Sequence, residues 1–271
     1  SDYLSMLYEL FNNRADQFIH DIARRLIVDA AQRSIELFDD IFDQTTEDMY
    51  DFISVLPIFY QVGIDLAPLS KKYREYFPTR LTHRYDEPLG TALHTKNYDL
   101  LLDIIVDASF LDYAHKVLPP GLFNLPKSNY QSILYGCRKL PFIHDQDNED
   151  DFHDQNYYAT HVVCVLTVYG VAPLQQTPFT QSVYRYFNKH FVCVRHELDD
   201  IDLLGECLQC LKAYGKGRRQ DVVEAERYLV SQQHDDGSWR NPPEDDDDAY
   251  DIFHPVWTSV VGLHYGSFMT V

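Results

Sequence analysis

Three apolar segments in the C-terminal half of the chain end with the same dipeptide, and this repetition constrains the fold more than any other feature. Each segment closes with Tyr-Gly, and successive glycines lie 45 and 51 residues apart. Glycine is favoured just beyond a helix because it adopts the left-handed conformation there at no steric cost. The segments, which predict three apolar helices, are YYATHVVCVLTVYG ending at Gly170, DLLGECLQCLKAYG ending at Gly215 and FHPVWTSVVGLHYG ending at Gly266.

Shorter amphipathic segments, QSVYRYFNKHF and DVVEAERYLVSQQ, lie between the apolar ones. A repeat of this length indicates stacked helical hairpins, with apolar helices inside and amphipathic helices outside. Such an array is either an open solenoid or a closed α/α toroid, and the repeat does not decide between them.

The rest of the chain also has the spacing of helices. Apolar residues recur at intervals of three and four over residues 15–42, and further helices are predicted at 48–63 and 96–118, with a bend or stop near Pro57. Residues 77–94 and 118–156 have the composition of loops. We therefore predict one all-α domain over residues 1–271, with irregular helices in 1–150 and toroid-like hairpin repeats in 151–271.

Composition excludes several classes of function. The formal net charge of -19 disfavours nucleic acid and anionic membrane surfaces as partners, because both require clustered Lys and Arg. No apolar run reaches the roughly 18 residues of a membrane span. The five cysteines are an odd number and lie mostly in apolar runs, which favours buried thiols in a reducing compartment. We expect a cytoplasmic protein whose partner is a small-molecule substrate.

The segment Glu224–Trp239 carries a resemblance to a known family. It resembles the QW motif of squalene–hopene-type terpenoid cyclases, whose α/α toroid is shared by protein prenyltransferase β subunits. Glu224 departs from the motif, which usually has a basic residue there. The resemblance is confined to the chain after Phe152, and it implies a toroid or partial toroid in which Gln and Trp tie neighbouring hairpins together. The matching residues are Ala225, Tyr228, Leu229, Gln233, Gly237, Ser238 and Trp239.

Aligning the three apolar segments on their Tyr-Gly ends brings four metal-ligating side chains to similar levels. His161 and Glu206 both lie nine residues before the glycine, His254 lies twelve before it, and Asp202 thirteen. Asp202 and Glu206 share a helix face because they are four residues apart. Two imidazoles and carboxylates with open positions suit Fe or Zn, with Mn as a further candidate. We predict a divalent-metal site formed by His161, Asp202, Glu206 and His254.

The resemblance adds to this prediction. In prenyltransferase β subunits a zinc-ligand His is followed three residues later by an aromatic residue, as His254 is by Trp257 here. Those subunits also use an Asp-x-Cys pair where this chain has Asp200 and Asp202. Without the thiolate, prenyl transfer to a protein thiol is not expected, and an oxygen-rich site favours iron or manganese. Glu206 and Tyr158 are the predicted catalytic residues, with Tyr158 donating a hydrogen bond or proton to substrate.

Each of these residues also has a purely structural interpretation. His161 is also explained as a core histidine bonded to a backbone carbonyl, and His254 as a helix cap before Pro255. Asp202 suits the first turn of a helix, where the helix dipole favours acids. Glu206 is harder to explain structurally, because a carboxylate in an apolar segment is costly unless it is paired or coordinates something.

Three functional hypotheses follow. The first is a metal-dependent enzyme acting on a small apolar metabolite, by oxidative tailoring with iron or by a lyase or hydrolytic step with zinc. The second is a metal-independent terpenoid cyclase-like enzyme, and the third is a non-catalytic helical-repeat binding protein. The motifs DDIFD (Asp39–Asp43) and DDDD (Asp245–Asp248) match terpene-synthase patterns, but such matches are weak in a chain with 42 acidic residues.

Overall fold

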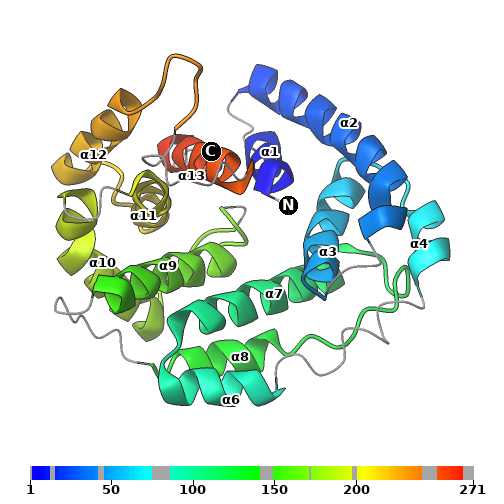
Figure 1. The fold of residues 1–271 in the computed structure, drawn as a ribbon, viewed down its shortest axis with the longest axis horizontal. Coiled ribbons are helices and arrows are strands. Elements are labelled where there is room, and N and C mark those ends of the chain that lie inside the picture. Colours follow the sequence, from blue (N-terminus) through cyan, green and yellow to red (C-terminus); the bar gives the residue numbers. More distant parts are fainter. Residues whose placement is uncertain are drawn as a thin grey trace. The chain divides into compact units, whose positions relative to one another are not determined.

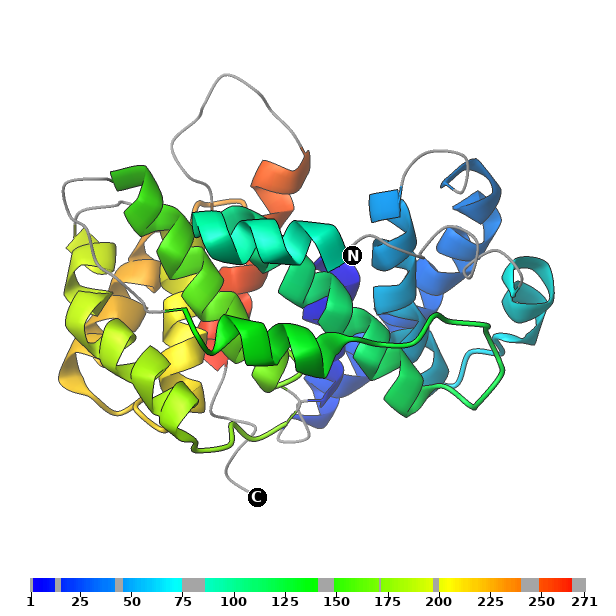
Figure 2. The same ribbon diagram turned by 90° about the horizontal axis from the view of Figure 1, so that it is seen from below.

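The computed structural model describes residues 2–12, 16–41, 46–74, 86–140, 149–170, 172–196, 200–239 and 249–264 (Figures 1 and 2). These residues form helices and no strand, so the all-α prediction is confirmed for this part of the chain. Its twelve helices are α1 (Asp2–Asn12), α2 (Gln17–Ile41), α3 (Thr46–Gln61), α4 (Ala67–Tyr73), α6 (Asp86–Thr95), α7 (Tyr98–Val117), α8 (Tyr130–Cys137), α9 (Glu149–Leu166), α10 (Pro178–His196), α11 (Ile201–Ala213), α12 (Gln220–Ser231) and α13 (Ala249–His264).

The chain divides into two compact units. The first contains residues 3–8 and 21–143, and the second contains residues 9–20 and 144–271. The C-terminal unit therefore includes a short N-terminal segment that carries the end of α1.

In the N-terminal unit, α3 and α7 pack against each other, and α6 and α8 pack against α7. Pro57 lies inside α3, which continues to Gln61. The predicted loops are partly helical, since α6 covers residues 86–95, α8 covers 130–137 and α9 begins at Glu149. Pro88 lies in the first turn of α6, where its missing N–H breaks no helical hydrogen bond, so its presence does not indicate a loop.

In the C-terminal unit, α11 is the central helix. Every residue from Ile201 to Ala213 is buried, and α9, α10, α12 and α13 all contact this helix. Its contact with α13 is the closest. A Cβ atom added at Gly205 would lie 2.6 Å from the carbonyl carbon of Thr258, and one added at Gly262 would lie 2.5 Å from the carbonyl oxygen of Gly205. The two glycines thus allow the backbones of α11 and α13 to touch.

The ends of α11 are fixed by local hydrogen bonds. Asp200 caps its start by accepting from the N–H of Leu203 at 3.0 Å. At its end, Gly215 has a φ of +71°, and its N–H donates to the carbonyl of Lys212 at 2.8 Å. This confirms the predicted left-handed glycine at Gly215. Gly170 is also left-handed, with a φ of +83°, whereas Gly266 lies outside the described residues.

Lys212 holds three helices together from within the C-terminal unit. Its buried Nζ donates to the carbonyls of Gly262 and Leu263 at 2.6 and 2.9 Å, and it lies 2.5 Å from Oε1 of Glu226. A cation at these carbonyls also suits the negative end of the α13 dipole. The side chain therefore fixes the end of α13 against α11 and α12.

The QW-like segment fastens the loop after α12 onto that helix. Gln233 Nε2 donates to the carbonyl of Gly237 at 2.9 Å, and the buried Trp239 donates through Nε1 to the carbonyl of Leu229 at 2.7 Å. These bonds are local. They give the segment a structural role.

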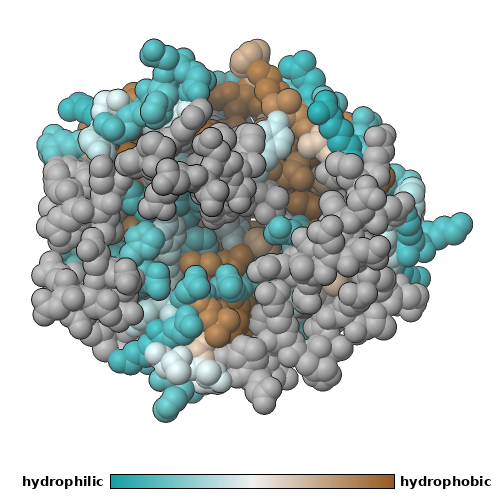
Figure 3. Space-filling view, in the orientation of Figure 1, coloured by the Kyte–Doolittle hydropathy of each residue, from teal (hydrophilic) through white to brown (hydrophobic). Residues whose placement is uncertain are grey.

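On the face drawn in Figure 3, the described residues are largely hydrophilic, with hydrophobic side chains showing in smaller areas between them. Across the described ranges, no helix combines the length and hydrophobicity that a membrane crossing requires.

Candidate metal centre

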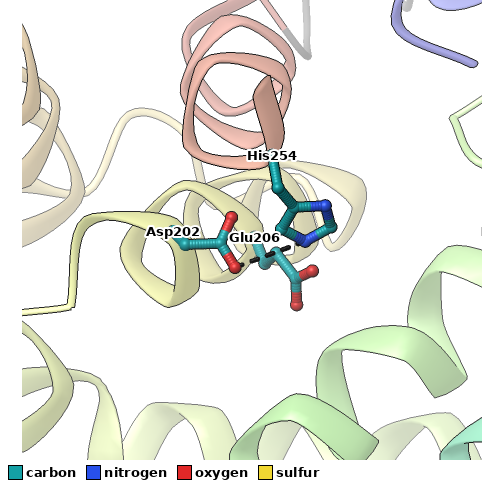
Figure 4. A group of neighbouring side chains, drawn as sticks. All are labelled: Asp202, Glu206 and His254. Atoms are coloured by element: carbon teal, nitrogen blue, oxygen red, sulfur yellow. Dashed lines mark ion pairs between the residues drawn. The ribbon is translucent and has the colours of Figure 1, made fainter. Parts of the chain in front are cut away.

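Asp202, Glu206 and His254 come together inside the C-terminal unit (Figure 4). Each offers one ligand atom, and the three atoms lie within 4.8 Å of one another. The side chains are only 4%, 4% and 7% exposed. In Figure 4, Asp202 and Glu206 extend from α11 and His254 from α13 towards the same space. We call these three residues the acidic centre.

The crossing of α11 and α13 positions the acidic centre. Asp202 and Glu206 are one turn apart on α11, and Gly205 lies between them in sequence. Gly205 touches the backbone of Thr258 on α13. His254 is one turn before Thr258 on the same face of α13, so the close crossing brings the imidazole to the two carboxylates.

Hydroxyl groups orient the Asp202 carboxylate. Tyr157 donates to its Oδ2 at 2.7 Å, and Thr258 donates to its Oδ1 at 2.7 Å. His254 Nε2 lies 3.4 Å from Asp202 Oδ2. Both carboxylate oxygens therefore have fixed directions, as is usual for ligands whose outer partners set their orientation.

Glu206 has a strongly perturbed acidity. Burial and the charge of Asp202 raise its pKa to about 8, against smaller opposing effects of His254 and of the hydrogen bond from Thr160. Two carboxylates this close in a buried site require a compensating proton or cation. Burial and the neighbouring carboxylate therefore favour the protonated form of Glu206.

His161 lies beside the acidic centre and is not one of its three residues. Its Nδ1 is 2.9 Å from the carbonyl oxygen of Tyr157 and 3.5 Å from Oε2 of Glu206. The contact with a backbone carbonyl is the one expected of a structural histidine. Of the four predicted metal ligands, Asp202, Glu206 and His254 therefore lie together, and His161 lies next to Glu206.

Tyr157 contacts the acidic centre through its hydrogen bond to Asp202. Tyr158, the residue predicted to act on substrate, is a fully buried side chain of α9. Tyr157 precedes His161 by four residues, so the two share a face of α9. Tyr157 and His161 are four residues apart, as are Asp202 and Glu206. The same rule would therefore have identified Tyr157 from the sequence as a candidate.

A hydrogen-bonded chain connects Asp202 to the surface. Tyr157 OH lies 3.2 Å from Oδ2 of Asp200, which is 3.1 Å from Nε2 of His153. The His153 side chain is 42% exposed, and its hydrogen bond to Asp200 raises its pKa. Burial opposes ionisation of Asp200, but the bonds from His153 and the Leu203 N–H hold the pKa of this carboxyl below its usual value. Sequence analysis missed His153, although it lies four residues before Tyr157.

The thiols near the acidic centre have little nucleophilic reactivity. Burial raises the pKa of Cys207 well above its usual value, and the same holds for Cys210. Buried thiols of this kind are structural rather than nucleophilic. The side chains of Asp39–Asp43 and Asp245–Asp248, which carry the two acidic motifs, lie outside the described residues.

The donor set of the acidic centre, one imidazole and two carboxylates with hydroxyl groups behind them, could hold a divalent cation. No family model, no curated protein and no solved structure matches the chain.

Proposed function

We propose that the C-terminal unit binds a divalent metal ion through Asp202, Glu206 and His254, and that the protein is a metal-dependent enzyme acting on a small molecule. The observation that carries this proposal is the approach of three buried ligand atoms within 4.8 Å of one another. A divalent cation would compensate both carboxylates, whose burial is otherwise costly.

The types of ligand atom narrow the choice of metal. Carboxylates suit manganese and other hard cations, whereas imidazole suits iron and zinc. One imidazole with two carboxylates therefore favours iron or manganese over zinc. Three protein ligands leave positions open for substrate, and the metal would act there as a Lewis acid or, with iron, in oxidative chemistry. His161, beside Glu206, would orient that ligand rather than bind the metal.

The toroid is part of the proposal. The complete burial of α11 between α9 and α13 supports an inner layer of apolar helices. The amphipathic α10 and α12, which also contact α11, would form the outer layer. In a toroid or partial toroid of this kind, the acidic centre would lie near the start of the inner helices.

A second candidate function is metal-independent acid catalysis of the terpenoid cyclase kind. It is favoured by the burial of Glu206 beside Asp202, which raises the pKa of this carboxyl to about 8. Such a carboxyl carries a proton at neutral pH and could transfer it to an apolar substrate. This candidate requires that the purified protein functions with no metal.

The decisive experiment measures metal content by mass spectrometry, as purified and after reconstitution with iron, manganese or zinc. The variants Asp202→Asn, Glu206→Gln and His254→Gln should each lose a near-stoichiometric ion that the wild type retains. Glu224→Gln and His234→Gln make the same chemical changes at exposed positions and should retain it.

The variant His161→Gln separates a ligand from an orienting residue, because it should keep the ion with weakened affinity. A wild-type protein that binds none of the three metals would contradict the metal proposal and leave the acid-catalysis candidate. Equal loss of metal in the exposed controls would show that the binding is nonspecific.

A further inference from the structure

A second buried polar group lies in the C-terminal unit, one helical turn along from the acidic centre. Glu9 of α1 is 4% exposed, and its Oε2 accepts from Nε2 of Gln209 at 3.2 Å. Gln209 follows Glu206 by three residues on α11. Trp257 follows His254 by three on α13, and their rings are in edge contact at 5.3 Å. One turn of helix is about 5.4 Å, so this group adjoins the acidic centre.

Two atoms of this group are buried without a normal hydrogen bond. Among the described residues, neither Oε1 of Glu9 nor Nε1 of Trp257 has a partner of suitable distance and angle. The two side chains nevertheless interact. Burial raises the pKa of Glu9 well above its usual value, and the neighbouring Trp257 and Gln209 side chains partly offset this. Buried polar atoms are nearly always hydrogen-bonded, so a ligand atom that bonds to both side chains would supply the missing partner.

The surrounding contacts hold both side chains in place. The Cys164 thiol donates to Oε1 of Gln209 at 3.8 Å, which directs the amide N–H towards Glu9. Trp257 stacks on Tyr169, with ring centroids 6.4 Å apart and planes at 28°. Tyr169 has a φ of +50°, a left-handed conformation that is unfavourable for this residue type. Such a conformation persists only where the surrounding structure holds the residue in place.

We propose that Glu9 and Trp257 form a polar subsite that binds an uncharged oxygen function, an alcohol or a carbonyl, of a small molecule. Trp257 Nε1 can only donate, so the bound atom must be an acceptor. Glu9 donates to the same oxygen when it is protonated and accepts from a hydroxyl when it is not. An anionic ligand is disfavoured because Asp202 and Glu206 lie one turn away.

This subsite defines a substrate class for the enzyme. That its ligand is the substrate rests on the proposed function, whereas binding of the oxygen function does not require a metal. An oxygen held here would lie about one helical turn from the metal ligands, so a neighbouring atom of the same small molecule could reach the ion.

The test is a ligand titration of metal-free protein. The chain has two tryptophans, so the variant Trp239→Phe leaves Trp257 as the only indole fluorophore. We expect 1-butanol and 2-butanone to change its emission saturably, and butyrate to have no such effect. Adding Glu9→Met, which keeps a side chain of similar length without its polar atoms, should weaken binding at least tenfold. Glu224→Gln, which alters an exposed carboxylate, should leave binding unchanged.

Calorimetric titration of the chain with both tryptophans gives a second measurement if Trp239→Phe fails to fold. Absence of saturable binding to either probe would overturn the subsite and leave the pair holding water only. Equal binding by the Glu9→Met variant would overturn the role of Glu9. Neither result depends on metal content, so failure of the subsite and failure of the metal proposal are distinguishable.

Discussion

At the scale of single residues, Glu206 should make the stability of the metal-free protein depend on pH. Its pKa is about 8 in the folded protein against 4.5 for an unperturbed Glu, so the folded state binds more protons between these values. Stability should therefore fall as pH rises from about 4.5 to 8, by up to about 3 kcal/mol at pH 7, and level off above pH 8.

Urea unfolding at pH 5.5, 7 and 8.5 in the presence of a chelator measures this dependence. Glu206→Gln should remove most of the decline, whereas Glu224→Gln should retain it. An unchanged decline in the Glu206→Gln variant would mean that another group carries the proton.

Tyr157 should set metal affinity through Asp202. Tyr157→Phe removes the 2.7 Å hydrogen bond to Oδ2 and leaves the ring in place. Loss of a group that orients a ligand typically weakens metal binding by 10- to 100-fold. Competition titration with a metal indicator measures the change. Tyr158→Phe makes the same change one residue along, in a fully buried side chain, and should leave affinity close to wild type. The opposite order of effects would favour Tyr158 as the functional tyrosine.

At the scale of helices, the crossing of α11 and α13 should be intolerant of a single methyl group. Gly205→Ala would place a Cβ atom 2.6 Å from the backbone of Thr258, which neither helix can relieve without moving. We expect a loss of about 1–3 kcal/mol or more in the free energy of unfolding, together with lower metal affinity.

Gly90 offers the matched control. It lies in α6 with no atom within 4 Å of an added Cβ, so Gly90→Ala should stabilise the N-terminal unit by about 0.5–1 kcal/mol. Urea unfolding followed by circular dichroism compares the two variants. A Gly205→Ala variant with wild-type stability and metal affinity would show that the backbones of α11 and α13 are not in close contact at Gly205.

Interactions within one helix could be predicted from the sequence, whereas interactions between helices could be predicted only in part. The pairing of Asp202 with Glu206 and the left-handed Gly215 depend on neighbours a few residues away. The approach of His254 was predicted from the Tyr-Gly repeat, which gives its level on α13 but not the glycine contact that brings it close. The contact between Tyr157 and Asp202 could not be predicted from the sequence, because it depends on the direction of the side chain, which adjacent positions in a helix do not share.

At the scale of the whole molecule, the N-terminal segment belongs with helices near the other end of the chain. Glu9 contacts Gln209 across 200 residues of sequence, a separation at which no local pattern predicts pairing. The compact unit that contains the acidic centre therefore includes residues 9–20 as well as residues 144–271. Both segments contribute to this unit, so its stability should depend on residues that precede the main segment of the N-terminal unit.

Removal of residues 1–12 should consequently destabilise the C-terminal unit, although helix α1 lies far from residues 144–271 in the sequence. Both tryptophans, Trp239 and Trp257, belong to that unit, so their fluorescence follows its unfolding in urea. We expect the midpoint of this transition to fall in the truncated chain. The Glu9→Met variant, which keeps α1 and removes a buried carboxyl group, should unfold at or above the wild-type midpoint while losing the subsite. An unshifted tryptophan transition after truncation would contradict the assignment of residues 9–20 to this unit, whereas a fall in both variants would make Glu9 itself essential to folding.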